Sequence, residues 1–219
     1  MQYDHLVLVI FSYSILLAAV LGYFRYEKIP AADRPFLFLI WIGLINEIVS
    51  EITTAVFKNT SVNSNIYVLI ESLLYCQLFL NWGSFKRNLN LFWATIVFLV
   101  VTWIYDNLFA HSITHINSFF RIVSSFVLVF LAIDQVNKLI TEERGHLFRN
   151  YRFLVCLGMI LFFTYRAYVE VFYWQELHVS ILFYRNIYNI MIIINLFVNL
   201  MYALAVLWIP TRQRFTLPS

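Results

Sequence analysis

The fold of this chain is decided by Asn46-Glu47-Ile48-Val49-Ser50-Glu51-Ile52-Thr53-Thr54, a polar stretch inside an apolar run that covers residues 36–57. A helix through this run places Glu47 and Glu51 on one stripe, because residues four positions apart are neighbours on a helix. An ionisable side chain inside a membrane is energetically costly and by default marks a functional site that faces the bundle interior or a water-filled cavity. The stretch therefore predicts a helix whose charged stripe meets partners on other helices.

The composition places the chain in a membrane. Of its 219 residues, 62% are hydrophobic and only 12% are charged, and the mean hydropathy is +0.76. A soluble core of this size could not bury so much apolar surface, so we expect an all-α integral membrane protein. The net charge of +3 comes from basic residues scattered through short loops, which argues against a nucleic-acid partner. Cys76 and Cys156 have no metal-binding spacing and are expected to be buried thiols.

Apolar runs long enough to cross the bilayer occur seven times along the chain. A span needs about 20 helical residues, since the hydrocarbon core is roughly 30 Å thick. The loops between the runs are too short to form a separate domain, so we expect residues 1–219 to form one transmembrane domain, a seven-helix bundle. The alternative is six spans, with the short third run lying at the interface. The expected spans are residues 5–24, 36–57, 66–82, 91–109, 119–140, 153–174 and 180–209.

The loops predict the orientation of the bundle. In the seven-span arrangement one side carries a single basic residue, Lys58. By the positive-inside rule the N-terminus is outside and the C-terminus is cytoplasmic, and a bacterial-type inner (plasma) membrane is the expected location. The eleven basic residues of the other side are Arg25, Lys28, Arg34, Lys86, Arg87, Lys138, Arg144, Arg149, Arg152, Arg212 and Arg214.

The remaining arginines lie inside the predicted spans, at the depth of several glutamates. At a rise of about 1.5 Å per residue, these side chains fall between the midplane and the outer end of the bundle. Because unpaired charges at that depth are costly, we expect one network that also leaves a single negative charge or a shared proton. The predicted ligand-binding residues are the carboxylates Glu47, Glu51, Glu71 and Glu170 and the guanidiniums Arg121, Arg166 and Arg185.

A faint internal repeat accompanies this pattern. The tripeptide 65–67, Asn-Ile-Tyr, recurs at 186–188, and the acidic pair at 47 and 51 has a counterpart in Arg166 and Glu170. Such recurrences suggest a 3+1+3 arrangement of two parallel three-helix halves, as found in some small transporters.

The histidines suggest a different chemistry. His111 and His115 are four positions apart and would share a face if their loop were helical, and Asp106 or His178 could supply a third ligand. Such a set could hold zinc with an open coordination position. No HExxH motif is present, and imidazoles are common in interfacial loops, so we expect no cofactor and keep zinc at His111, His115 and His178 as the alternative.

Three functions remain open from the sequence. The first is a heptahelical protein that binds a small polar or charged solute in the outer half of the bilayer, as a carrier or a receptor with a cytoplasmic or membrane protein partner. The second is a membrane-embedded hydrolase, metal-dependent or not, that acts on a lipid-like substrate. The third is a structural subunit of a membrane complex. The sequence holds no P-loop, dinucleotide fingerprint or GxSxG motif, which favours a non-enzymatic function.

Overall fold

The protein is a bundle of helices. The computed structural model describes residues 11, 13–86, 88–142, 147–174 and 181–210, which form helices and no strands. Short 3-10 turns precede α3 and α7, and a π-helical turn, Tyr105–Ala110, continues α5. The α-helices of the described residues are α2 (Ile15–Arg25), α3 (Arg34–Phe57), α4 (Ser61–Trp82), α5 (Leu89–Ile104), α6 (Ser118–Glu142), α7 (Tyr151–Trp174) and α8 (Ile181–Trp208).

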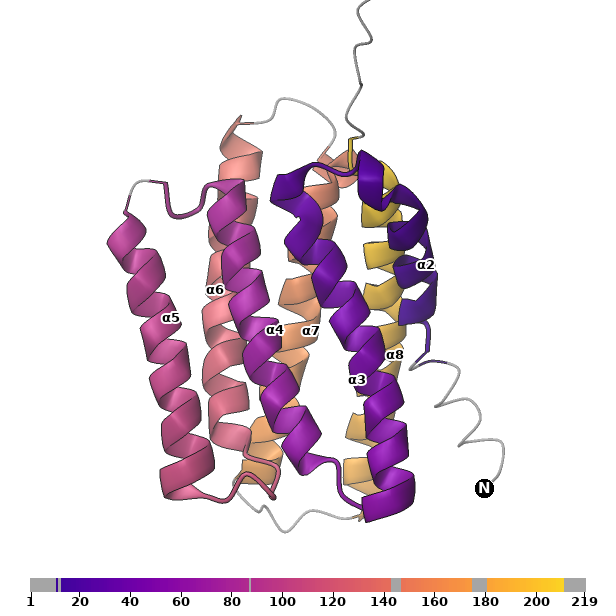
Figure 1. The fold of residues 1–219 in the computed structure, drawn as a ribbon, viewed down its shortest axis with the longest axis vertical. Coiled ribbons are helices and arrows are strands. Elements are labelled where there is room, and N and C mark those ends of the chain that lie inside the picture. Colours follow the sequence, from indigo (N-terminus) through magenta and orange to yellow (C-terminus); the bar gives the residue numbers. More distant parts are fainter. Residues whose placement is uncertain (1–10, 12, 87, 143–146, 175–180, 211–219) are drawn as a thin grey trace, which may run out of the picture.

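Local sequence signals set several helix ends. Pro35 lies in the first turn of α3, where a missing backbone N–H costs nothing. Gly83 ends α4 with a φ of 89°, a left-handed conformation that glycine adopts without strain. The side chain of Asn88 accepts a hydrogen bond from the backbone N–H of Asn90 and so caps α5. Helices that follow one another in the chain are therefore joined by short connections and run antiparallel (Figure 1).

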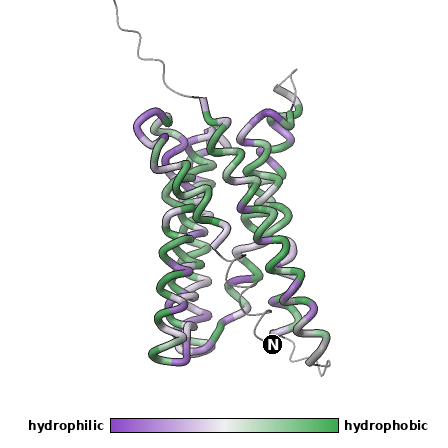
Figure 2. Tube along the Cα trace, turned by 90° about the vertical axis from the view of Figure 1, so that its right-hand side faces the viewer, coloured by the Kyte–Doolittle hydropathy of each residue, from purple (hydrophilic) through white to green (hydrophobic). Residues whose placement is uncertain are grey.

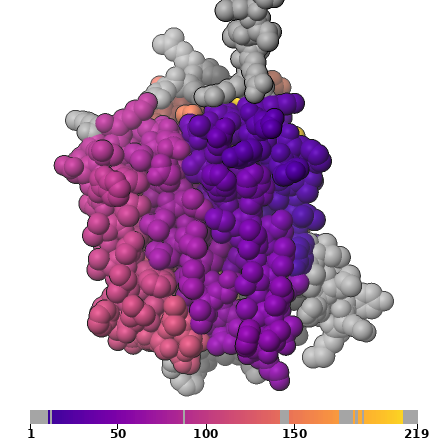
Figure 3. Space-filling view, in the orientation of Figure 1, coloured from indigo at the N-terminus to yellow at the C-terminus, as the bar shows by residue number. Residues whose placement is uncertain are grey.

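The helices form a ring with α5 outside it. α2, α3 and α4 follow one another along one side, and α6, α7 and α8 along the other. α2 packs against α8 at one edge and α4 against α6 at the other (Figure 1). α3 and α4 lie side by side on the face seen in Figure 3, with α5 at its edge. Helices from both halves of the chain therefore surround a common interior.

Five segments are long and apolar enough to cross a membrane, which confirms a multi-pass helical membrane protein. Hydrophilic residues gather at both ends of the bundle, and the helix lengths between them are mostly hydrophobic (Figure 2). Large side chains such as Phe24 and Phe130 point outward, as expected of surfaces in contact with lipid. The five segments are Ala31–Phe57, Leu89–Ala110, Ser118–Thr141, Tyr151–Trp174 and Asn189–Trp208.

The other two expected spans are helical but differ from the five. α2 has 11 residues, and residues 5–10 and 12 of the expected span 5–24 lie outside the described residues. α4 begins at Ser61, five residues before the expected start at 66, and is not among the five segments. Its length of 22 residues is nevertheless enough for a bilayer at about 1.5 Å per residue.

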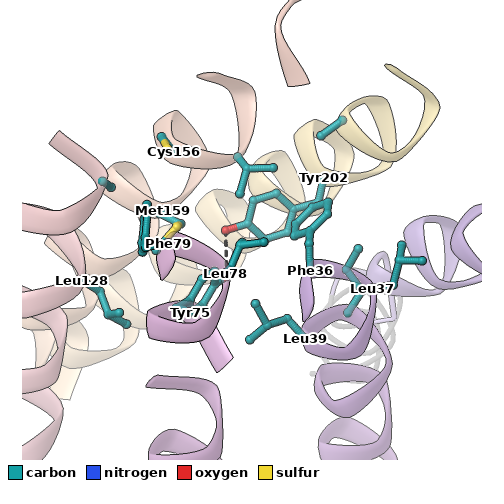
Figure 4. Packing of buried hydrophobic residues seen from close by; sticks show 14 of the residues in the cluster. Phe36, Leu37, Leu39, Tyr75, Leu78, Phe79, Leu128, Cys156, Met159 and Tyr202 are labelled. Carbon is teal, nitrogen blue, oxygen red and sulfur yellow. Dashed lines mark hydrogen bonds between the residues drawn. The ribbon is translucent and has the colours of Figure 1, made fainter. Parts of the chain in front are cut away.

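A dry aromatic core fills the half of the bundle nearer the α4–α5 connection. Phe36 and Tyr202 meet edge to face with ring centroids 5.3 Å apart (Figure 4). The rings of Tyr75 and Phe163 meet in the same way at 5.5 Å. Cys76 and Cys156 are buried as free thiols, as expected. In contrast, no residue of α3 from 44 to 57 is fully buried by the described residues. The two halves of the bundle are therefore packed differently.

A buried carboxylate anchors this dry half. Asp33, which precedes α3, is 2% exposed. Its Oδ1 accepts hydrogen bonds from Trp82 Nε1 at 2.8 Å and from Tyr151 Oη at 2.9 Å. Asp33 thereby joins the start of α3 to the end of α4 and the start of α7.

Replacement of Gly158 tests the packing of α7 on α8. A Cβ atom at Gly158 would lie 2.8 Å from Cε1 of Tyr202 and 3.4 Å from Cγ1 of Val198. We expect Gly158→Val to push the helices apart and lower the free energy of unfolding by about 1–3 kcal/mol. Thermal unfolding in detergent measures the change, and Leu161→Val, at a half-exposed position of the same helix, is the control. Equal melting temperatures for the two variants would contradict this packing.

Candidate functional site

A buried ion pair joins α4 to α7. Nη1 of Arg166 donates to Oε2 of Glu71 at 2.7 Å, and both side chains are less than a tenth exposed. The hydroxyl of Tyr67, one turn before Glu71, donates to the other carboxylate oxygen at 2.9 Å. Both oxygens of Glu71 are therefore bound, as a carboxylate requires at this depth.

A second pair joins α6 to α7 one helical turn away. Nη1 of Arg121 lies 3.6 Å from Oε1 of Glu170, and the hydroxyl of Ser118 donates to Oε2 of Glu170 at 2.6 Å. Arg121 also reaches α4, where its Nη2 donates to Ser64 Oγ at 2.8 Å and to Asn65 Oδ1 at 3.2 Å. We name Glu71, Arg121, Arg166 and Glu170 the charged layer.

The charged layer holds two donor groups that are not used. Nε of Arg121 and Nη2 of Arg166 are buried and have no hydrogen-bond partner among the described residues. A buried donor without a partner costs about 1–3 kcal/mol, because its bonds to water are lost. The layer can therefore accept an additional group that offers oxygen atoms.

Polar residues of the α5–α6 connection cover the charged layer on the side away from the dry core. Asp106, which is fully buried, accepts a hydrogen bond from the backbone N–H of Phe120 at 2.8 Å and thereby caps the start of α6. Nδ2 of Asn65 donates to the backbone oxygens of Ile113 at 3.1 Å and His115 at 2.7 Å. These bonds fix the connection between α5 and α6 over the two ion pairs.

A small cavity adjoins the charged layer on the side of the dry core. Its volume is about 60 Å³. The carboxylate-bearing Glu71 lines it together with Tyr67, Tyr75, Tyr202 and Asn195. The hydroxyls of Tyr75 and Tyr202 lie 3.1 Å apart and form its inner wall (Figure 4). This space is large enough for ordered water or a small ion next to the Glu71 carboxylate.

The structure brings together four of the seven predicted ligand-binding residues and leaves two apart. Glu51 is exposed and accepts a hydrogen bond from the hydroxyl of Tyr13 at 2.6 Å. Glu47 is half-buried, and neither glutamate has an ion pair within the described part of the chain. α3 packs on α2 and α4, whereas the two ion pairs of the described residues lie among α4, α6 and α7. A single network that includes Glu47 and Glu51 therefore stays a prediction. Arg185 belongs to α8, but its side chain is not among those described.

The two pairs of residues that the predicted repeat matches lie in different environments. Arg166 and Glu170 are buried and paired, whereas Glu47 and Glu51, their expected counterparts, are more exposed and outside any described ion pair.

The expected zinc geometry is not formed in the described residues. His111 and His115 are exposed, and the segment that contains them is irregular rather than helical. Nδ1 of His111 lies 3.1 Å from Oδ1 of Asp106. No three His, Cys, Asp or Glu side chains come together within the described ranges, and His178 lies outside them.

Comparisons with protein-family models, with curated proteins and with solved structures gave no significant match.

Removal of a buried charge should lower the free energy of unfolding far more than removal of an exposed charge. Arg121→Gln leaves Glu170 buried with Ser118 as its remaining partner, so we expect a loss of about 3–5 kcal/mol in the free energy of unfolding. The control is Lys138→Gln, which breaks the partly exposed i,i+4 pair with Asp134 and should cost less than about 1 kcal/mol. Thermal unfolding of the purified variants measures both, and comparable losses would contradict the burial of the charged layer.

Proposed function

We propose that the protein is a heptahelical membrane protein that binds a small polar or charged solute at the charged layer, as a carrier or a receptor. In this proposal α2 and α4 also cross the membrane, with the N-terminus outside and the C-terminus in the cytoplasm. The arrangement of α2–α4 opposite α6–α8, with α5 apart, is consistent with a 3+1+3 organisation.

The observation that carries the proposal is the cavity beside Glu71. A carboxylate faces it, and the guanidinium of Arg166 on the same carboxylate keeps an unused donor. A carboxylate offers a site for an amine or a proton, and a guanidinium offers one for an oxygen anion. A ligand that carries such groups would replace water and complete the bonding of the layer.

The dry core favours a site that opens toward the predicted outer side. The Tyr75–Tyr202 contact and the rings of Phe36 and Phe163 separate the cavity from the opposite end of the bundle. A carrier would have to part Tyr75 from Tyr202 to release a solute inward. A receptor needs no such opening and would pass a change in the packing of α7 to a partner.

A structural function is the second candidate. Each carboxylate of the charged layer already has a guanidinium partner, which is sufficient to orient α4, α6 and α7 without a ligand. The two functions differ in whether ligand addition changes the stability of the protein.

A thermal-shift screen distinguishes the two. The purified protein is heated with amino acids, organic acids, nucleosides, sugars, lipids or divalent metals, beside Arg166→Gln. A ligand of the charged layer present at 100 times its Kd should stabilise wild type by about 2.7 kcal/mol and leave Arg166→Gln unchanged. Tyr23→Phe, at an exposed position, is the control that should keep the response. No response from wild type, together with an unstable Arg166→Gln, would favour the structural function.

The topology is tested by cysteine labelling. Both native cysteines are fully buried, so a thiol reagent should react only with an introduced cysteine. Lys58 and Lys86 are exposed at opposite ends of α4. In intact cells we expect a membrane-impermeant maleimide to label Lys58→Cys but not Lys86→Cys, which should react only after the cells are opened. Labelling of both from one side would show that α4 does not cross the membrane.

A further inference from the structure

A groove separates α5 from α6, away from the charged layer. Its volume is about 750 Å³. Its floor and walls are apolar over Leu91, Val127, Phe130 and Leu131. The groove exists because α5 packs along α4 and touches α6 only lightly, so that α5 stands at the edge of the bundle (Figure 1).

One end of the groove is polar and charged. Ser84, Asn88, Asp134 and Lys138 line it. Asp134 and Lys138 lie eight and four residues before the end of α6 at Glu142. At a rise of about 1.5 Å per residue this is roughly 6–12 Å from the helix end, the depth at which a lipid headgroup meets its acyl chains.

The polar end has one donor and one acceptor to spare. The ammonium of Lys138 donates to Asp134 Oδ2 at 2.6 Å and to the backbone oxygen of Ser84 at 3.3 Å. An ammonium has three N–H groups, so one is left. Oδ1 of Asp134 has no hydrogen-bond partner among the described residues. A free N–H therefore lies beside a free carboxylate oxygen, at the end of an apolar groove.

We propose that this groove binds a glycerophospholipid with a phosphoethanolamine headgroup. The lipid phosphate accepts from the remaining N–H of Lys138, and the lipid ammonium donates to Oδ1 of Asp134. One acyl chain lies between α5 and α6 against Leu91, Phe130 and Leu131. The site is independent of the function proposed for the charged layer.

Charge complementarity selects this headgroup over the other common ones. A purely anionic headgroup would satisfy Lys138 but would face the carboxylate of Asp134 without a partner for it. A choline headgroup carries a positive charge but has no N–H to donate to Asp134. Of the ethanolamine, glycerol and choline headgroups, only ethanolamine matches both groups with hydrogen bonds.

The test is thermal stabilisation of delipidated, detergent-purified protein by phosphatidylethanolamine, phosphatidylglycerol or phosphatidylcholine with the same acyl chains. Two variants address the two parts of the site. Lys138→Gln removes the phosphate contact. Thr95→Trp fills the groove, and the hydroxyl that it removes donates to the backbone oxygen of Leu91 in the same helix. Lys58→Gln, an exposed lysine at the other end of the bundle, is the matched control.

We expect phosphatidylethanolamine to stabilise wild type and Lys58→Gln more than the other two lipids do. Each of the two site variants should weaken its binding by about five-fold or more, as expected for the loss of one charged contact or of the acyl site. Equal stabilisation by all three lipids, or a preference for phosphatidylglycerol, would overturn the proposal. Native mass spectrometry that shows a second copy of the chain in place of lipid, or unchanged lipid binding in both variants, would also overturn it.

Discussion

The ion pair between Glu71 and Arg166 is the contact on which the interior of the bundle depends. A single charge in a hydrocarbon environment is too costly to leave unpaired, so the pair fixes which faces of α4 and α7 point inward. Glu170 follows Arg166 by one turn and must then face inward as well, which brings it to Arg121. The polar side chains of α4 that face this layer, Ser64 and Asn65, bind Arg121 inside the bundle.

One end of the bundle interior is filled by aromatic rings and the other holds charged side chains, and the functional proposal rests on this difference. Toward the α4–α5 connection, interlocked aromatic rings leave no room for a solute. Toward the other end, the charged layer keeps unused donors and adjoins a cavity that Glu71 lines. The groove between α5 and α6 lies outside the ring, at the lipid boundary. Like the interior, it joins an apolar region to a charged one, because its apolar walls end at Asp134 and Lys138.

The sequence was sufficient to predict the helices and part of the charged layer. Apolar runs predicted seven spans, and five segments of the structure are long and apolar enough to cross a membrane. The depth of Glu71, Arg121, Arg166 and Glu170 predicted that they would meet. Spacing along α3 could not show that Glu51 is exposed, because that depends on which helices pack beside it. Neutral partners such as Ser118 and Asn65 were missed for a similar reason: hydroxyls and amides give no signal until a charge lies within reach.

The most direct test of the account is charge reversal across the Glu71–Arg166 pair. Glu71→Arg and Arg166→Glu are made singly and together, and the detergent-solubilised protein is examined by size-exclusion chromatography. The account predicts that each single variant, which places two like charges in contact, is lost as aggregate and that the double variant recovers a monodisperse peak. Single variants that behave like wild type, or a double variant no better than the singles, would contradict the claim that this pair orients the helices.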